Sequence, residues 1–225
     1  MNLNMFEQFS SPELLMVPTT MLSMLVPILL THNKPNLLGN RMTTALTHLL
    51  KIIMLNLVSQ TSLDGQKWSK TLASLLILIL FSNLLGLLPY TFTTTSQLSM
   101  NMAIAIPLWM ATVITGMMKT PSSALAHMLP EGSPALLTPF MIMIETISLL
   151  MRPVALGVRL TANITAGHLL MTMVSTTTLS LITNIATSLT TWAILFALTT
   201  LELAVACIQA YVFTLLVLLY LQENT

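Results

Sequence analysis

The sequence predicts an all-α, polytopic membrane protein with two or three ordinary transmembrane helices, an interfacial amphipathic helix, and a hairpin of two long, steeply inclined membrane helices. Of the 225 residues, 55% are hydrophobic and only 7% are charged, which is far too apolar for a soluble domain. Several apolar runs reach the roughly 20 residues that cross a bilayer as a helix. The single cysteine, Cys207, excludes an internal disulfide.

A single membrane domain, residues 1–225, is expected to begin with a transmembrane span at residues 12–31. Pro18 and Pro27 lie within this span. Proline is tolerated in membrane helices where neighbouring groups satisfy the carbonyl that it leaves without a donor. We therefore expect a bent helix rather than a break.

Residues 36–60 have a different pattern, in which polar and apolar side chains occupy opposite faces of a helix. The polar face carries Arg41, His48 and Lys51. A helix of this kind is typical of the membrane surface. The alternative is a further span, which would bury these three side chains in lipid.

Two ordinary spans are expected at residues 71–89 and 100–118. The first ends at Pro89, and the second is followed directly by Lys119. The loop between them is polar and uncharged, so both helix ends can reach water. The two segments therefore predict a pair of adjacent spans.

The remaining residues predict a hairpin of inclined helices at 136–175 and 180–222. A helix of about 40 residues is roughly 60 Å long, about twice the thickness of the hydrocarbon layer. Each half could instead form two spans, with a turn near Pro153 and Gly157. Such a turn would bury unpaired backbone groups beside two arginines, which lipid does not tolerate.

The first of these long helices carries charged and polar groups that are expensive in a membrane. At about 100° per residue they fall on one narrow stripe with small residues, and His168 projects to the opposite side. The stripe consists of Glu145, Ser148, Arg152, Ala155, Arg159, Ala162, Asn163 and Ala166. Small residues let another helix approach closely, so this face predicts a contact surface with a cation at its centre.

Positively charged residues predict the orientation in the membrane, because they gather on the inner side. Five of them fall between the first and second spans, against one acid, Asp64: Lys34, Arg41, Lys51, Lys67 and Lys70. The N-terminus and loop 90–99 are then outside, and loop 119–135 and the C-terminus are inside. Glu145 lies toward the inside, Arg159 near the middle and His168 toward the outside.

Four segments resemble subunit a of the rotary F-type ATP synthase in its mitochondrial form. They are IETIS (144–148), RLTANITAGHLL (159–170), FSNLLGLLPY (81–90) and LELAVACIQAYVFTLL (201–216). The resemblance covers most of the chain and is weakest over residues 1–60. It implies a proton-conducting stator subunit with no active site of its own, which serves a rotating ring of c subunits through two offset half-channels.

The resemblance also implies a role for each polar group. Arg159 corresponds to the family's essential arginine, and Asn163 to the polar group one turn later. His168 and Glu202 correspond to the titratable pair of the outer half-channel, Gln209 to the glutamine two turns further on, and Glu145 to an acid of the inner half-channel. Arg152 is not the match to the essential arginine. Its position next to Pro153 leaves two roles open, which are support of the inner channel and bonding to freed backbone carbonyls.

The same family implies the surroundings of the chain. Its protein partners are the c-subunit ring, the peripheral stalk and other membrane subunits of the synthase, and it transports protons across the lipid bilayer. The location is the mitochondrial inner membrane, with the N-terminus in the intermembrane space and the C-terminus in the matrix. No cofactor, metal ion or nucleic acid is expected.

Two pairings imply the register of the hairpin. If Arg159 meets Gln209 and His168 meets Glu202, both pairings centre the bend near Asn184. Other interpretations remain for these groups: His168 as a packed core histidine, and Glu202 and Gln209 as helix-bridging side chains. For the whole chain, the alternatives are an ion-coupled transporter, another respiratory proton-pumping subunit or a membrane anchor. We find no internal repeat of the kind that transporters contain, and an anchor leaves the buried charges unexplained.

Overall fold

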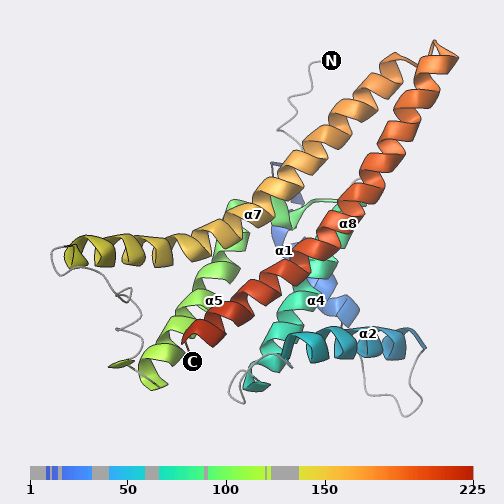
Figure 1. The fold of residues 1–225 in the computed structure, drawn as a ribbon. Helices are drawn as coiled ribbons and strands as arrows, with labels where there is room; N and C mark the ends of the chain where they lie inside the picture. Colours follow the sequence, from blue (N-terminus) through green and yellow to red (C-terminus); the bar gives the residue numbers. More distant parts are fainter. Residues whose placement is uncertain are drawn as a thin grey trace. The chain divides into compact units, whose positions relative to one another are not determined.

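The computed structural model describes residues 9–10, 12–14, 17–31, 41–58, 66–88, 91–119, 121–122 and 137–224. Helices make up nearly all of the regular structure in these ranges, which confirms the all-α prediction (Figure 1). In chain order the elements are β1 (Glu13–Leu14), β2 (Val17–Pro18), α1 (Thr19–Thr31), α2 (Arg41–Val58), α4 (Ser69–Gly86), the 3-10 turn η2 (Thr94–Ser96), α5 (Leu98–Lys119), α7 (Thr138–Ser180) and α8 (Ile185–Asn224).

Four of the described helices, α4, α5, α7 and α8, are long and apolar enough to cross a membrane. Large apolar side chains on them point outward, among them Phe196, which is 72% exposed. Such exposure suits contact with lipid tails rather than with water. Helix α2 is not one of the four.

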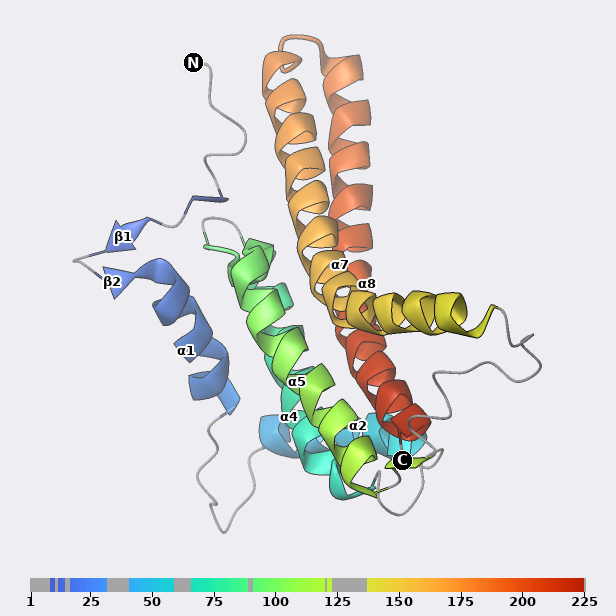
Figure 2. The ribbon, with the colours of Figure 1, turned by 90° about the vertical axis from the view of Figure 1, so that its left-hand side faces the viewer.

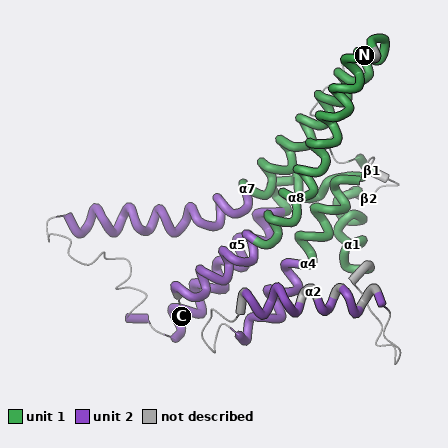
Figure 3. Tube along the Cα trace, turned by 45° about the vertical axis from the view of Figure 1, so that its right-hand side comes forward, with its two compact units in different colours: residues 1–32, 77–100, 159–211 green, residues 33–76, 101–158, 212–225 purple. Residues whose placement is uncertain are grey.

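The chain divides into two compact units, which Figure 3 colours separately. One comprises Met1–His32, Ile77–Met100 and Arg159–Tyr211, and the other comprises Asn33–Leu76, Asn101–Val158 and Val212–Thr225. The border between the units passes through α4, α5, α7 and α8. Each unit therefore gathers helical segments that are far apart in the sequence.

A helical hairpin forms the main body of the first unit. Residues from Arg159 onward in α7 run antiparallel to the beginning of α8, and the two lie side by side in Figures 1 and 2. The bend occupies residues 181–184, where the Asn184 amide donates to the Leu181 carbonyl at 3.1 Å. The chain therefore reverses where the two pairings predicted, although α7 continues to Ser180, five residues beyond the expected end.

Hydroxyl side chains are numerous in this hairpin, and the backbone satisfies them locally. Thr172 donates to the Leu169 carbonyl at 2.9 Å, Ser175 to the Thr172 carbonyl at 2.9 Å, and Thr178 to the Ser175 carbonyl at 2.6 Å. A hydroxyl bonded to a carbonyl one turn back needs no other partner. This explains how a threonine-rich stretch remains a continuous helix in an apolar environment.

Helix α1 begins later than the expected span at residues 12–31. Glu13–Leu14 and Val17–Pro18 pair as two short antiparallel strands, and the helix starts at Thr19. A residue before proline is driven toward an extended backbone, so Pro18 holds Val17 out of the helix. Pro27 lies inside α1 as expected; residues 15–16 of the expected span are outside the described residues.

The second unit contains α2, the first two turns of α4, most of α5, the first part of α7 and the end of α8. Its buried apolar side chains include Leu72, Leu76, Leu156, Phe213 and Leu218. On α2, the side chains of Arg41, His48 and Lys51 are exposed, as its polar face requires. Residues 36–40 and 59–60 of the expected helix, and residues 89 and 136 at the ends of two others, fall outside the described residues.

Candidate functional site

A pocket with a mainly apolar lining and a few polar side chains lies within the first unit, where α7, α8 and α4 meet. Its volume is about 240 Å³. The polar side chains that line it, which define the polar pocket below, are Asn83, Asn163, His168, Glu202 and Gln209. Four of these five are residues that the sequence singled out, and the structure brings them together from two facing helices.

His168 and Glu202 are both half-buried in the pocket, and Gly167 determines how closely their helices approach. A Cβ atom at Gly167 would collide with Oε1 of Glu202 and would lie 3.1 Å from its Cδ. Only glycine therefore lets the Glu202 carboxyl group lie against the backbone of α7. Glycine inside a helix costs about 1 kcal/mol relative to alanine. A glycine in the middle of a predicted helix is therefore a signal that could have pointed to Gly167.

Gln209 links the two helices of the hairpin at the level of Arg159. Its Nε2 donates to the Arg159 carbonyl oxygen at 2.9 Å, which confirms that these two residues meet. The contact reaches the arginine's backbone rather than its guanidinium group. This contact therefore does not occupy the guanidinium group of Arg159.

The Arg159 side chain is exposed, and so are its neighbours Ala162, Asn163 and Ala166. Leu160, which points elsewhere, is 2% exposed. Arg159 forms no ion pair with any acid in the described part of the chain. The small-residue face that the sequence predicted around Arg159 is therefore uncovered, with a cation at its centre.

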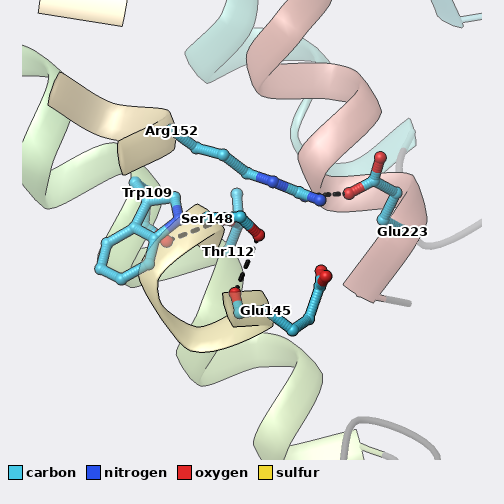
Figure 4. Close-up of polar contacts among 6 residues, drawn as sticks. All are labelled: Trp109, Thr112, Glu145, Ser148, Arg152 and Glu223. Atoms are coloured by element: carbon cyan, nitrogen blue, oxygen red, sulfur yellow. Dashed lines mark hydrogen bonds and ion pairs between the residues drawn. The ribbon is translucent and has the colours of Figure 1, made fainter. Parts of the chain in front are cut away.

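Arg152 has different surroundings, in the second unit (Figure 4). Its guanidinium group is ion-paired with Glu223 and lies over the ring of Tyr220, 5.3 Å from the centroid. Neither role considered for Arg152 in the sequence included this acid, because the expected helix ended at residue 222. Helix α8 continues through Glu223 to Asn224, two residues beyond the expected end, and Glu223 meets the arginine there.

Glu145 lies in the same unit and does not reach the polar pocket. Its side chain is half-buried, and its carbonyl accepts a hydrogen bond from the Ser148 hydroxyl at 2.8 Å. Figure 4 shows its carboxyl group extending toward the side on which Arg152 meets Glu223. Five of the six predicted site residues thus belong to the first unit, and Glu145 belongs to the second.

Asn83 also lines the pocket. It lies in the segment 81–90 that carries part of the family resemblance, but it was not among the predicted site residues. It is 2% exposed, and neither amide atom has a hydrogen-bond partner among the described residues. A buried polar group without a partner costs about 1–3 kcal/mol, so such groups are rare. Among the residues described, no cluster of three or more His, Cys, Asp or Glu side chains is placed to hold a metal ion.

The sequence is similar to those of known proteins. The family model described as "ATP synthase A chain" matches residues 14–222. Proteins named "ATP synthase F(0) complex subunit a" are 74% identical in Lycodon semicarinatus, 55% in Struthio camelus and 52% in Papio hamadryas, each alignment covering 100% of both chains. Four long apolar helices, two of them joined as a hairpin that carries charged and polar side chains, define a class of multi-pass membrane proteins. Within that class, the chain belongs to the ATP synthase subunit a family.

Proposed function

We propose that this chain is the proton-conducting, non-catalytic stator subunit of a mitochondrial F-type ATP synthase. Two offset half-channels would carry protons to and from the carboxyl groups of a rotating c-subunit ring. The observation that supports this most strongly is the pair of surfaces on one hairpin. Arg159, which has no ion-pair partner among the described residues, lies on an exposed face of small residues, and the titratable groups His168 and Glu202 lie in a pocket.

Arg159 acts as counter-charge and barrier. Each ring carboxyl group must be neutral while it faces lipid, because an ionised carboxylate in hydrocarbon is prohibitively costly. An opposite charge within a few ångström favours the ionised form, so the group releases its proton when it reaches Arg159. Arginine stays protonated at any physiological pH, and its fixed charge repels protons that would otherwise pass straight between the half-channels.

The polar pocket is the outer half-channel, in which protons travel toward the ring. Imidazole changes its charge near neutral pH, and a carboxyl group next to it can receive the proton that it releases. His168 and Glu202 line the same pocket, Glu202 lies against Gly167, and Asn163 belongs both to the pocket and to the exposed face. Protons would therefore pass from His168 and Glu202 toward the surface on which the ring moves.

Glu145 belongs to the inner half-channel, through which protons leave. Each proton that crosses about 100 mV releases roughly 2.3 kcal/mol, so several must pass for each ATP that is made. The long helices suit this task, because 43 and 40 residues correspond to about 60 Å or more, twice the hydrocarbon thickness. Inclined helices of that length can follow the curved edge of a ring.

The orientation follows from the basic residues between the first two spans. The inner, positively charged side is the matrix, which contains the C-terminus, and the N-terminus is in the intermembrane space. The relatives are named as subunits of an F(0) complex, which supports assembly with the ring, the peripheral stalk and other membrane subunits. The transport step needs no cofactor and no metal ion.

Reconstitution into lipid vesicles tests this function. We expect vesicles that contain the chain together with its c-subunit ring to take up protons under an imposed membrane potential, and vesicles with the chain alone to take up none. His168→Leu should stop proton uptake, whereas the matched change His48→Leu on α2, far from the pocket in sequence, should leave it unchanged. Transport of protons or a solute by the chain alone would contradict the proposal.

A further inference from the structure

Helix α2 has an exposed face that the proposed function does not use. Its exposed side chains Arg41, Lys51, Ile52 and Leu55 fall within about a third of the helix circumference at about 100° per residue. These four side chains are called the α2 face below. The face combines two cations with two large apolar groups, and α2 contains no Asp or Glu.

The two cations of the α2 face form no ion pair with any acid in the described part of the chain. Lys70, in the first turn of α4, is also exposed. Both segments belong to the second unit, and α2 lies beside the beginning of α4 (Figures 1 and 2). Cations that gather without acids create a positive surface potential, so this surface attracts anions.

The apolar side chains of the α2 face fit lipid better than water. Ile52 is 48% exposed and Leu55 is 59% exposed, and large apolar groups gain free energy when they leave water. Around the helix, Leu55 lies between Lys51 and Arg41, and Ile52 is next to Arg41. At a membrane surface, phosphate groups lie directly above acyl chains, so one helix face can find partners for both kinds of side chain.

Trp68 indicates the level of this surface in the membrane. It directly precedes α4 and is half-buried. Tryptophan is enriched where acyl chains meet the headgroups. Because α2 lies beside the beginning of α4, the α2 face is at the height of the headgroup phosphates.

We propose that the α2 face binds acidic phospholipids, with the headgroup phosphates on Arg41 and Lys51 and the acyl chains against Ile52 and Leu55. A guanidinium group can bond to two phosphate oxygens at once, and an ammonium group supplies a compact charge. The chain thereby selects acidic lipids at the membrane surface. None of these four residues belongs to the proposed proton path, so the inference goes beyond the proposed function.

The test uses the whole synthase in phosphatidylcholine vesicles. One preparation contains a small fraction of phosphatidylglycerol with a photoactivatable group in its acyl chain, and the other contains phosphatidylcholine with the same group. After illumination, mass spectrometry measures the labelling of α2. Each cation contributes a factor of roughly five near an acidic lipid, so we expect the labelling by phosphatidylglycerol to be at least roughly tenfold stronger.

Two double variants separate charge from apolar contact. Arg41→Gln with Lys51→Gln removes both cations and should reduce labelling by phosphatidylglycerol to the level of phosphatidylcholine. Arg41→Lys with Lys51→Arg exchanges the cations and keeps both charges, so it is the matched control and should retain the preference. An undiminished preference in the glutamine variant would overturn the inference.

A salt titration of the unchanged protein keeps the test decisive if the glutamine variant does not assemble. The Debye length falls from about 10 Å at 0.1 M to about 3 Å at 1 M ionic strength. The preference for phosphatidylglycerol should therefore fall several-fold over that range. A preference that does not change with salt would contradict binding of the headgroup by charge.

Two further results would also overturn the inference. Equal labelling by the two lipids would mean that α2 makes only apolar contact with the membrane. No labelling of α2 by either lipid would mean that another subunit, with an acidic surface of its own, covers the face. Neither result affects the proposed proton path, which His168→Leu tests separately.

Discussion

Two stretches of helix α7 invite comparison, because each contains one arginine and one glycine that touches a side chain of another helix. In the stretch 138–158, Arg152 is paired with Glu223 and lies over Tyr220. In the stretch 159–180, Arg159 is exposed and has no acidic partner among the described residues. An arginine therefore forms an ion pair within the chain in one stretch, whereas in the other the arginine has no acidic partner in the described part of the chain.

The difference supports the proposal that Arg159, and not Arg152, takes part in proton transport. A guanidinium group in the membrane needs a partner or water, since an isolated charge there costs several kcal/mol. Arg152 finds its partner within the chain. Arg159 does not, and the small residues around it allow another helix to come close. An unpaired charge on a smooth face is the arrangement that a passing carboxyl group requires.

Among the substitutions that keep the charge of the side chain, Arg159→Lys is expected to have the largest effect. Lysine keeps the charge but loses the planar set of donors, and it loses its proton more readily when desolvated. We expect Arg159→Lys to lower ATP synthesis by roughly a hundredfold, as when one preorganised electrostatic group is removed from a reaction centre. Rates are measured in vesicles that contain the whole synthase.

Arg152→Lys is the matched control for that variant, because lysine can still pair with Glu223. Its rate should stay within about twofold of the unchanged protein, as expected for a partly exposed ion pair. Similar losses in the two lysine variants would show that the two arginines do not differ in function.

The two glycines offer the next largest effect. Alanine at Gly167 places a Cβ against the Glu202 carboxyl group, whereas alanine at Gly157 meets the sulfur of Met102 at 2.6 Å. Methionine is flexible and can move aside, but displacement of the Glu202 carboxyl disturbs the proton path. We expect Gly167→Ala to lower proton conduction about tenfold or more, as misplacement of a reacting group does.

Gly157→Ala should conduct normally in the same measurement. If both alanine variants conduct normally, the close approach at Gly167 has no part in transport.

Gln209 should show a smaller effect, because its bond to the Arg159 carbonyl supports the hairpin but not the transferred proton. Gln209→Leu removes one hydrogen bond, which is worth about 1 kcal/mol. We expect ATP synthesis to fall by roughly fivefold on that basis. Gln222→Leu, at an exposed position near the end of the same helix, is the control and should have no effect. An inactive Gln209→Leu that assembles normally would mean that the amide takes part directly in transfer.

The smallest effect is expected at the Arg152–Glu223 pair. The side chains are 29% and 48% exposed, and ion pairs of this kind contribute about 1 kcal/mol or less. Glu223→Gln should lower the thermal stability of the assembled sector slightly and leave ATP synthesis within about twofold. Arg152→Glu combined with Glu223→Arg should restore the stability that either single change removes. Loss of ATP synthesis in Glu223→Gln would instead show that Glu223 takes part in proton transport.

The hairpin could be predicted from the sequence because two pairings share one bend. In an antiparallel pair of continuous helices, every contact across the pair implies the same turning point, and Arg159–Gln209 and His168–Glu202 agreed on the region of Asn184. The face around Arg159 could also be predicted, because the 3.6-residue period of the helix determines which side chains lie on the same side. Local rules were sufficient for both features.

Other features depend on how separate segments pack against one another. The periodicity of a single helix carries no information about that packing. Asn83 lines the pocket because α4 lies beside the hairpin, and Gly167 matters because Glu202 comes from the facing helix. Glu223 was not selected, and the expected helix ended two residues before Asn224. The start of α1 was predicted too early because the pairing of Glu13–Leu14 with Val17–Pro18 leaves little trace in the sequence.

The most direct test of the role of Arg159 compares ATP synthesis in Arg159→Gln and Arg152→Gln. Both variants remove one positive charge from α7, and each is measured in vesicles with equal amounts of assembled synthase. We predict that Arg159→Gln makes no ATP, because no cation remains to ionise the ring carboxyl group, and that Arg152→Gln makes ATP at close to the normal rate. ATP synthesis at a normal rate by Arg159→Gln would contradict the assignment of Arg159 as the counter-charge of the ring.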